Sequence, residues 1–345
     1  MIKDKNTEHH IQKSNILVTG ASGTVGFEVL KQLLEKENYN VFVFDKKTKL
    51  SEEKLEPLAH QMVLLYGDIS NPKDLESLKN IDAVIHLAAI IPPLADEHPE
   101  LAQKVNTEGT QNLIHQLEKH SPNAFFMYSS SISVYGDRIE NPYIEVGDAL
   151  IPSEGDAYAK TKILAERSLK ESKLDWTIFR LAAIMGNHKI SKLMFHQPLN
   201  TALEIATPRD TARAFVNGIE KQLELSKRIF NLGGGESCRI SYEHFLERSF
   251  AIFGLGKLSF PEHSFADKNF HCGFYADGDA LEEIVHFRQD SLEDYFKMEA
   301  EKVSVVKKAA ASIFKVPIKW YLLKQSEPYH VYKENDQKAM AHYFN

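Results

Sequence analysis

A tyrosine and a lysine four residues apart, Tyr158 and Lys162, have the clearest potential for chemistry in this sequence. On a helix, residues at this spacing share one face. An ammonium group beside a phenol stabilises the phenolate and lowers the phenol pKa from about 10 toward neutrality. We therefore expect Tyr158 to exchange a proton with a substrate hydroxyl or carbonyl group at physiological pH.

The surroundings of this pair matter more than its spacing, because Tyr329 and Lys333 are also four residues apart but have no comparable motif around them. Tyr158 instead follows a strand-like run whose end carries a cluster of hydroxyl side chains, residues 128–136. A surface pair on an amphipathic helix is the structural alternative for Tyr158, and the hydroxyl cluster favours the catalytic interpretation.

Strand-like apolar runs alternate with helical segments along most of the chain. This order predicts an α/β fold with a doubly wound parallel sheet covered by helices on both faces. In such a sheet, ligands bind outside the carboxyl ends of the strands. The predicted strands are 15–18, 41–44, 62–66, 83–87, 124–129 and 176–181, and the predicted helices are 25–36, 71–78, 101–119, 158–172 and 207–225.

Three glycines lie where the first strand would turn into the first helix. Gly20 suits a tight turn, Gly23 lets the backbone approach a phosphate, and Gly26 lets the helix pack closely on the strand. The second strand ends at Asp45, whose carboxylate can bind ribose hydroxyls. This order of strand, turn, helix, strand and acid predicts a dinucleotide site, with the pyrophosphate at the helix N-terminus.

Two further loops follow predicted strands at the same sheet edge. Asp68 can reach an adenine amino group, or it can act as a turn residue before Asn71. The small side chains Ala88 and Ala89 let a cofactor lie close to the backbone. His86, inside the preceding apolar strand, is better explained as a hydrogen-bonded core residue than as a catalyst.

Composition limits the classes of function. The chain has 345 residues, of which 43% are hydrophobic, enough for a sizeable core. Its 41 basic and 48 acidic residues give a net charge of −7, which argues against nucleic-acid partners. Only two cysteines, Cys238 and Cys272, fit a reducing compartment, so we expect a cytoplasmic protein. Residues 1–13 are polar and predict a flexible tail, and neither His9-His10 nor His271-Cys272 has the partners of a metal site.

The order of these motifs resembles the extended short-chain dehydrogenase/reductase family, in its sugar epimerase/dehydratase-like form. The resemblance covers residues 15–240. It is carried by the glycine turn, Asp45, the segment 67–69, the segment 86–89, the segment 105–110, the hydroxyl cluster, Tyr158 with Lys162, and the segment 231–235.

The resemblance implies roles for individual residues. Tyr158 would be the catalytic acid/base, Lys162 would hold the nicotinamide ribose, and Ser131 would polarise the reacting substrate oxygen. Asn106 resembles the family's structural asparagine. The implied cofactor contacts are Gly20, Ser22, Gly23, Thr24, Val25, Gly26, Asp45, Asp68, Ile69, Leu87, Ala88, Ala89, Asn106, Tyr158 and Lys162. The cofactor would be a nicotinamide dinucleotide that carries hydride.

Cofactor and substrate are predicted less directly. Asp45 would repel a 2′-phosphate and favours NAD, while Lys46 and Lys47 leave NADP open. Residues 187–208 offer His188, Lys189, Lys192 and His196 but no arginine, which disfavours a nucleotide diphosphate. The family's dehydratases carry an acid pair after a threonine in this loop, and the resemblance places Ser131-Ile132-Ser133 there without carboxylates, which disfavours a dehydratase. We expect an oxidoreductase or epimerase for a small polar, sugar-like substrate, with a non-catalytic cofactor sensor as the alternative.

The remaining expectations concern domains and partners. A Rossmann domain would span 14–186 and 207–235, an abbreviated substrate lobe 187–206 and 236–290, and a helical extension 291–345. The resemblance implies that helices 101–119 and 158–172 form a homodimer interface. The segment from Lys297 to Lys324 contains seven lysines and two glutamates, with apolar residues between them. A helix packed on the core explains this pattern better than a basic amphipathic helix on an anionic membrane, but both remain open. No segment is long and apolar enough to span a membrane.

Overall fold

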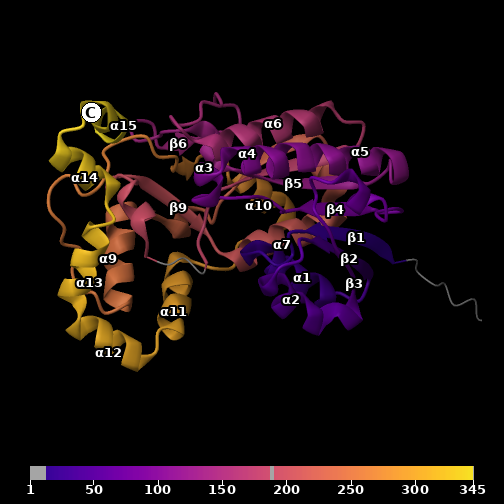
Figure 1. Ribbon diagram of the computed structural model, residues 1–345. Coiled ribbons are helices and arrows are strands. Elements are labelled where there is room, and N and C mark those ends of the chain that lie inside the picture. The colour runs from indigo at the N-terminus through magenta and orange to yellow at the C-terminus, as the bar shows by residue number, and fades with distance from the viewer. Residues whose placement is uncertain (1–12, 187–189, 345) are drawn as a thin grey trace, which may run out of the picture.

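The computed structural model describes residues 13–186 and 190–344, and every structural statement below concerns those residues. Seven parallel strands form the main sheet, in the order β10-β7-β5-β4-β1-β2-β3 (Figure 1). The doubly wound fold is therefore confirmed. The strands are β1 (Ser14–Thr19), β2 (Tyr39–Asp45), β3 (Val63–Tyr66), β4 (Ala83–His86), β5 (Phe125–Ser131), β7 (Asp175–Leu181) and β10 (Arg228–Leu232).

Helices cover both faces of this sheet (Figure 1). Alternate side chains of β1 enter different cores, with Ile16 and Val18 in one and Leu17 in the other. This alternation explains why the strands appear as continuous apolar runs in the sequence. One face carries α1 (Thr24–Glu35), α2 (Lys49–Leu55) and α7 (Pro208–Gly218), and the other carries α4 (Pro99–Ala102), α5 (Thr110–His120) and α6 (Ala157–Glu171).

Three predicted helices differ from those observed. The span 101–119 is interrupted by a π-helical segment, Gln103–Gly109, between α4 and α5. An inserted π turn re-aims its side chains, and here it contains Asn106. The span 71–78 contains only a short 3₁₀ turn, Pro72–Leu75. The span 207–225 divides at Gly218, beyond which a 3₁₀ turn, Ile219–Lys221, leads into α8 (Gln222–Leu225).

A second lobe lies beside the carboxyl edge of the sheet (Figure 1). It contains a three-stranded sheet of β8 (Ala183–Ile184), β9 (Ala202–Ala206) and β11 (Arg239–Ser241). The pair β6 (Tyr143–Ile144) and β12 (Phe274–Tyr275) adjoins it. The remaining helices are α3 (Leu94–Glu97), α9 (Tyr242–Ile252), α10 (Asp279–Val285), α11 (Leu292–Lys302), α12 (Val305–Ile313), α13 (Lys315–Leu323), α14 (Glu327–Glu334) and α15 (Gln337–Tyr343).

The C-terminal helices share the core of this lobe. Tyr295 and Phe296 of α11 and Leu322 of α13 join Phe245 and Phe250 of α9 in one apolar cluster. We therefore propose that the segment expected as a separate extension completes the substrate lobe. α12 differs, because none of its residues is buried. No helix in the described ranges is long and apolar enough to cross a membrane.

The glycine turn provides a first prediction. A Cβ atom on Gly26 would overlap the carbonyl oxygen of Gly20, whereas a Cβ on Gly147 would meet no atom within 4 Å. Because backbone cannot yield as a side chain does, we expect Gly26→Ala to destabilise the protein by at least about 1–3 kcal/mol. Thermal unfolding measures this loss, and Gly147→Ala is the control that should melt like the wild type. Equal melting of both variants would contradict the packing argument.

Candidate active site

The glycine turn closes tightly between β1 and α1. Gly20 has a φ of +73°, a conformation that favours glycine, and its carbonyl accepts a hydrogen bond from the Gly23 N–H at 3.1 Å. α1 then begins at Thr24, so the N–H groups of Thr24 and Val25 belong to its first turn. First-turn N–H groups have no partner within the helix and can bind an anion.

A cavity of about 240 Å³ lies over this turn. Its backbone-rich walls fit the adenosine half of a dinucleotide, since the glycines and alanines expose main chain to a ligand. Thr24, Val25 and Gly26 lie outside its lining. The predicted residues that do line it are Gly20, Ser22, Gly23, Asp45, Asp68, Ile69, Leu87, Ala88 and Ala89.

Two carboxylates enter this cavity. Asp45 accepts hydrogen bonds from the N–H groups of Ser22 at 2.7 Å and Lys46 at 2.8 Å, so the second strand is tied to the glycine turn. Asp68 accepts from the Ser70 N–H at 2.9 Å and lies 3.2 Å from Lys46 Nζ. Bonding to Ser70 is the main cause that lowers the pKa of Asp68. Asp68 thus has the turn role and also lines the cavity, and its contact with an adenine amino group stays a prediction.

His86 is a core residue, as predicted. It is completely buried, with Nδ1 2.6 Å from Thr19 Oγ1 and Nε2 2.9 Å from Thr110 Oγ1. Burial lowers the pKa of His86 to about 3, so the ring stays neutral.

Asn106 connects the loop that lines the cavity over the glycine turn to α6. Its Oδ1 accepts from the Ile90 N–H at 2.7 Å, and its Nδ2 donates to the Ile90 carbonyl at 2.9 Å and to Thr161 Oγ1 at 3.0 Å. Asn106 does not line the cavity and fixes the loop after β4 against α6. Asn106 therefore holds Ile90 and Thr161 in position.

Ser131, Tyr158 and Lys162 are brought together at the end of β5. Ser131 neighbours the Tyr158 phenol and lowers its pKa, and Ser131 Oγ accepts a hydrogen bond from the Ser133 hydroxyl at 3.0 Å. Lys162 is 2% exposed and donates to the Ser129 carbonyl at 2.8 Å. Its Nζ lies 5.6 Å from the centre of the Tyr158 ring. The ammonium thus approaches the ring of Tyr158, while the phenol group faces Ser131.

The expected lowering of the Tyr158 pKa is wrong for the unliganded protein. Burial raises the pKa of Tyr158, an effect that the neighbouring Ser131 only partly offsets. Burial also lowers the pKa of Lys162 to about 7, because a buried ammonium loses its hydration. The charge of Lys162 would favour a lower pKa of Tyr158, but the loss of hydration of the phenol and of the ammonium outweighs it.

A buried ion pair that the sequence analysis missed holds α6 to the sheet. Glu166, on α6, accepts from Arg180 of β7 at 2.9 and 2.8 Å and from the Ser130 hydroxyl at 2.6 Å. Both charged side chains are at most 3% exposed. Glu166 lies four residues after Lys162 on the same face of α6, and this spacing was the available signal. The pair fixes the helix that carries Tyr158.

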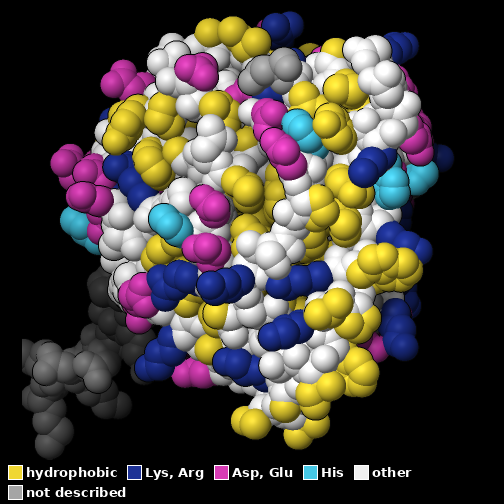
Figure 2. Space-filling view, turned by 90° about the vertical axis from the view of Figure 1, so that its left-hand side faces the viewer, with side chains coloured by type: hydrophobic (Ala, Val, Ile, Leu, Met, Phe, Trp, Pro, Cys, Tyr) yellow, Lys and Arg dark blue, Asp and Glu magenta, His cyan; other side chains and the backbone are white. Residues whose placement is uncertain are grey.

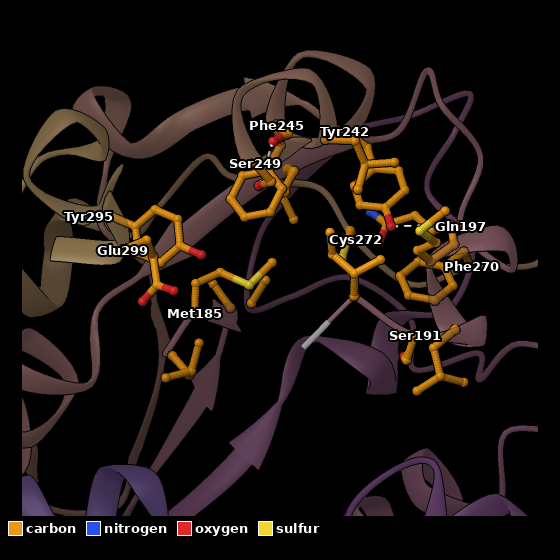
Figure 3. Close-up of a pocket in the computed structure, with 18 of the residues that line it drawn as sticks. Met185, Ser191, Gln197, Tyr242, Phe245, Ser249, Phe270, Cys272, Tyr295 and Glu299 are labelled. Carbon is orange, nitrogen blue, oxygen red and sulfur yellow. Dashed lines mark hydrogen bonds between the residues drawn. The ribbon is translucent and has the colours of Figure 1, made fainter. Parts of the chain in front are cut away.

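A second cavity, of about 340 Å³, adjoins Ser131 and extends into the lobe (Figure 3). Tyr295 and Glu299 lie at one end, Gln197 and Phe270 lie at the other, and Phe245 projects from above. Most of the lining is apolar, and the described lining contains no lysine or arginine. The principal apolar lining residues are Met185, Leu193, Met194, Leu203, Tyr242, Phe245, Leu246, Ile252, Phe253, Phe270, Tyr295 and Phe296.

The arginines around the lobe form ion pairs with carboxylates and do not line this cavity. Arg209 binds Asp290 at 2.5 Å, Arg239 binds Glu204 at 2.9 Å, and Arg288 binds Asp279. Of the other expected basic residues, Lys192 pairs with Glu327, and His188 and Lys189 lie outside the described residues. Within the described ranges, no three His, Cys, Asp or Glu side chains group as metal ligands.

Comparison with known proteins gives one family. A model described as "NAD dependent epimerase/dehydratase family" matches residues 16–204, more than half of the chain. D-erythronate dehydrogenase of Cupriavidus necator is 27% identical over 254 residues, which cover 64% of this chain and 77% of that protein. A 3-beta-hydroxysteroid dehydrogenase of Mycolicibacterium neoaurum is 33% identical over 164 residues, 44% of this chain and 41% of that protein. The chain thus spans less than half of this second relative.

Solved structures show the same fold. A UDP-glucuronic acid 4-epimerase from Bacillus cereus, in complex with UDP-glucuronic acid and NAD, has a TM-score of 0.68 at 21% identity. The match covers 83% of this chain and 98% of that one. The likeness therefore includes the second lobe as well as the main sheet.

Proposed function

The chain belongs to the NAD-dependent epimerase/dehydratase family, and we propose that within it the protein is an NAD-linked dehydrogenase or reductase for an apolar secondary alcohol or ketone. The observation that carries this proposal is that Ser131, the neighbour of Tyr158, lines a cavity with mostly apolar walls, although Tyr158 itself lies outside that lining. The family relation supports enzymatic activity over the non-catalytic sensor considered from the sequence.

The proposed chemistry assigns one task to each side chain. NAD, when bound, takes up or releases the hydride. Tyr158 would remove the proton from the substrate hydroxyl during oxidation and return it during reduction. Ser131 would donate a hydrogen bond to the same oxygen, where negative charge develops. Lys162 and Asn106 would keep α6 and the adjoining loops in place, with Lys162 also available to a ribose hydroxyl.

The walls of the cavity lead us to revise the expected substrate. A small polar, sugar-like molecule would leave its hydroxyl groups against Phe245, Phe296 and Met185 without hydrogen-bond partners, which is costly. A nucleotide diphosphate would need cationic ligands that the described lining lacks. One relative is named for a hydroxysteroid, an apolar alcohol of the proposed kind.

The test is a substrate panel with NAD. Formation of NADH would be measured with hydroxysteroids and cyclic terpene alcohols on one side, and with D-erythronate and UDP-glucose on the other. We expect turnover of apolar alcohols only. Turnover restricted to the polar compounds would overturn the assigned substrate class, and failure to bind NAD would overturn the proposal as a whole.

Cofactor preference gives a second prediction. The Asp45 carboxylate would face the ribose 2′ position, so removing its charge relieves repulsion of a 2′-phosphate. We expect Asp45→Asn to shift the ratio of the NADP and NAD dissociation constants toward NADP by about tenfold, or about 1.4 kcal/mol, slightly more than the interaction of two charges about 4 Å apart in bulk water. Calorimetric titration measures both constants. Asp82→Asn removes a charge at the opposite edge of the sheet and should leave the ratio unchanged; an equal shift there would contradict this role.

Cellular location and assembly stay proposals. The two buried cysteines remain consistent with the cytoplasm, and α5 with α6 remains the proposed homodimer face. Light scattering during size exclusion tests the dimer, and a monomer at every concentration would refute it.

A further inference from the structure

The helices α12 and α13 present an uncovered apolar surface. Val305 is 84% exposed, Ile313 76% and Trp320 58%. Monomeric soluble proteins rarely leave such side chains grouped together unless they meet a partner. We name this surface the α12–α13 face, and it consists of Val305, Val306, Ile313, Phe314, Val316 and Trp320.

The opposite side of the same helices is packed. Ala311, Ile318 and Leu322 join the lobe core, and Gly254 touches the main chain of Lys308 so closely that a Cβ would collide with it. The core therefore fixes which side of the helices faces outward. The sequence preference for a helix packed on the core agrees with this packed side, and the exposed apolar side chains of the α12–α13 face are an additional feature.

Positive charge surrounds the apolar side chains. Residues 304–324 contain five lysines and no aspartate or glutamate, although the whole chain carries a net charge of −7. Lys307, Lys308 and Lys315 are exposed and form no ion pair within the described residues. Figure 2 shows Lys and Arg side chains gathered over the lower part of this side of the molecule, with hydrophobic side chains beside and below them.

We propose that the α12–α13 face docks on the surface of a membrane that contains anionic lipids. Apolar and aromatic side chains between lysines are the pattern of a helix that lies in the interfacial plane, where the lysines meet lipid phosphates and the apolar side chains enter the acyl boundary. A protein partner would need matching acidic residues and a surface of complementary shape. A bilayer does not need a complementary shape, because lipids adapt to the convex surface that the two helices form. Charge complementarity thus favours the bilayer.

The docked face would lie at one end of the substrate cavity. Phe253 lines that cavity, and the next residue, Gly254, packs on α12. An apolar substrate dissolved in the bilayer would then be close to the enzyme. This consequence depends on the proposed substrate, but the docking itself does not.

Vesicle sedimentation tests the docking with the purified full chain. We expect it to sediment with vesicles of phosphatidylglycerol and phosphatidylcholine, to stay in solution with phosphatidylcholine alone, and to dissociate as salt rises. The double variant Ile313→Glu with Phe314→Glu should reduce the bound fraction by at least about tenfold, because two charges enter the apolar region. The control is Leu223→Glu, which changes an apolar side chain on α8 that is 92% exposed and lies outside the α12–α13 face. This variant should bind like the wild type.

Tryptophan fluorescence provides a second readout. The chain has two tryptophans, and Trp176 is only 7% exposed, so a shift to shorter wavelength with anionic vesicles would report Trp320.

Failure of the wild type to sediment, or unchanged sedimentation of the double variant, would overturn the proposal. A wild-type dimer that the double variant makes monomeric, without vesicle binding, would assign the face to a second copy instead. Tyr158→Phe should bind vesicles normally, which separates this test from that of the enzymatic activity.

Discussion

Tyr158→Phe is expected to lower kcat by about 10²–10⁴-fold, the usual contribution of a positioned acid/base group. The substitution removes only the phenolic oxygen, the atom whose ionisation the neighbouring Ser131 favours. The ring stays available for packing beside Lys162, so NAD binding and thermal unfolding should change little. Steady-state kinetics with an apolar alcohol measures the loss.

The chain contains a matched control for this variant. Tyr329 on α14 has Lys333 four residues later, with Nζ 5.5 Å from the ring centre, nearly the same arrangement as Tyr158 with Lys162. Tyr329 is not among the residues that line either cavity described above, so Tyr329→Phe should keep full activity. Unchanged kcat in Tyr158→Phe would remove the basis of the assigned mechanism.

The pH dependence of this reaction follows from the same pair. Burial raises the pKa of Tyr158, so the phenol is protonated at neutral pH. Oxidation of an alcohol needs the deprotonated form, and its rate should therefore increase with pH, whereas reduction uses the protonated form and should not. Initial rates in the two directions across neutral and alkaline pH test this difference.

Glu166→Gln is expected to destabilise the protein by about 3–5 kcal/mol, because it leaves the buried Arg180 without a counter-charge. Arg180 and Ser130 both bond to this carboxylate, and the sheet and α6 exclude water from it. Urea unfolding measures the free energy. Glu293→Gln, which breaks an exposed pair with Arg248, should leave the unfolding midpoint unchanged; similar losses in the two variants would contradict the assigned importance of burial.

The sign of the pH effect on stability can be stated for the same carboxylate. Bonding to Arg180 holds the pKa of Glu166 below its ordinary value despite burial. Glu166 therefore contributes stability that is fully present above its unfolded pKa of about 4.3 and is lost as pH falls through the lower folded value. Acid unfolding of Glu166→Gln should accordingly be less steep in this range than that of the wild type.

The features that could be predicted best from the sequence depend on neighbouring residues or on the order of the strands. The glycine turn, Asp45 and the hydroxyl cluster each depend on neighbours within one strand and its loop, and the parallel order places their loops at one edge. The role of His86 also followed from its local setting, since a histidine in an apolar strand needs buried hydroxyl partners.

Other features required the tertiary structure. The substrate cavity is built from segments as distant as Ser131, Gln197 and Phe296, so its apolar walls had no local signature. The pKa of Tyr158 depends on burial that spacing does not report. Exposure of Ile313 depends on which side of α12 meets the lobe core, and amphipathic spacing alone is compatible with either side.

The bonds from Glu166 to Arg180 and Ser130, together with that from Lys162 to the Ser129 carbonyl, join α6, β5 and β7 into one rigid wall. On the other side, Tyr242 and Phe245 of α9 and Tyr295 of α11 line the cavity that adjoins Ser131. A shift of the lobe on substrate binding would therefore leave Tyr158 where these bonds hold α6.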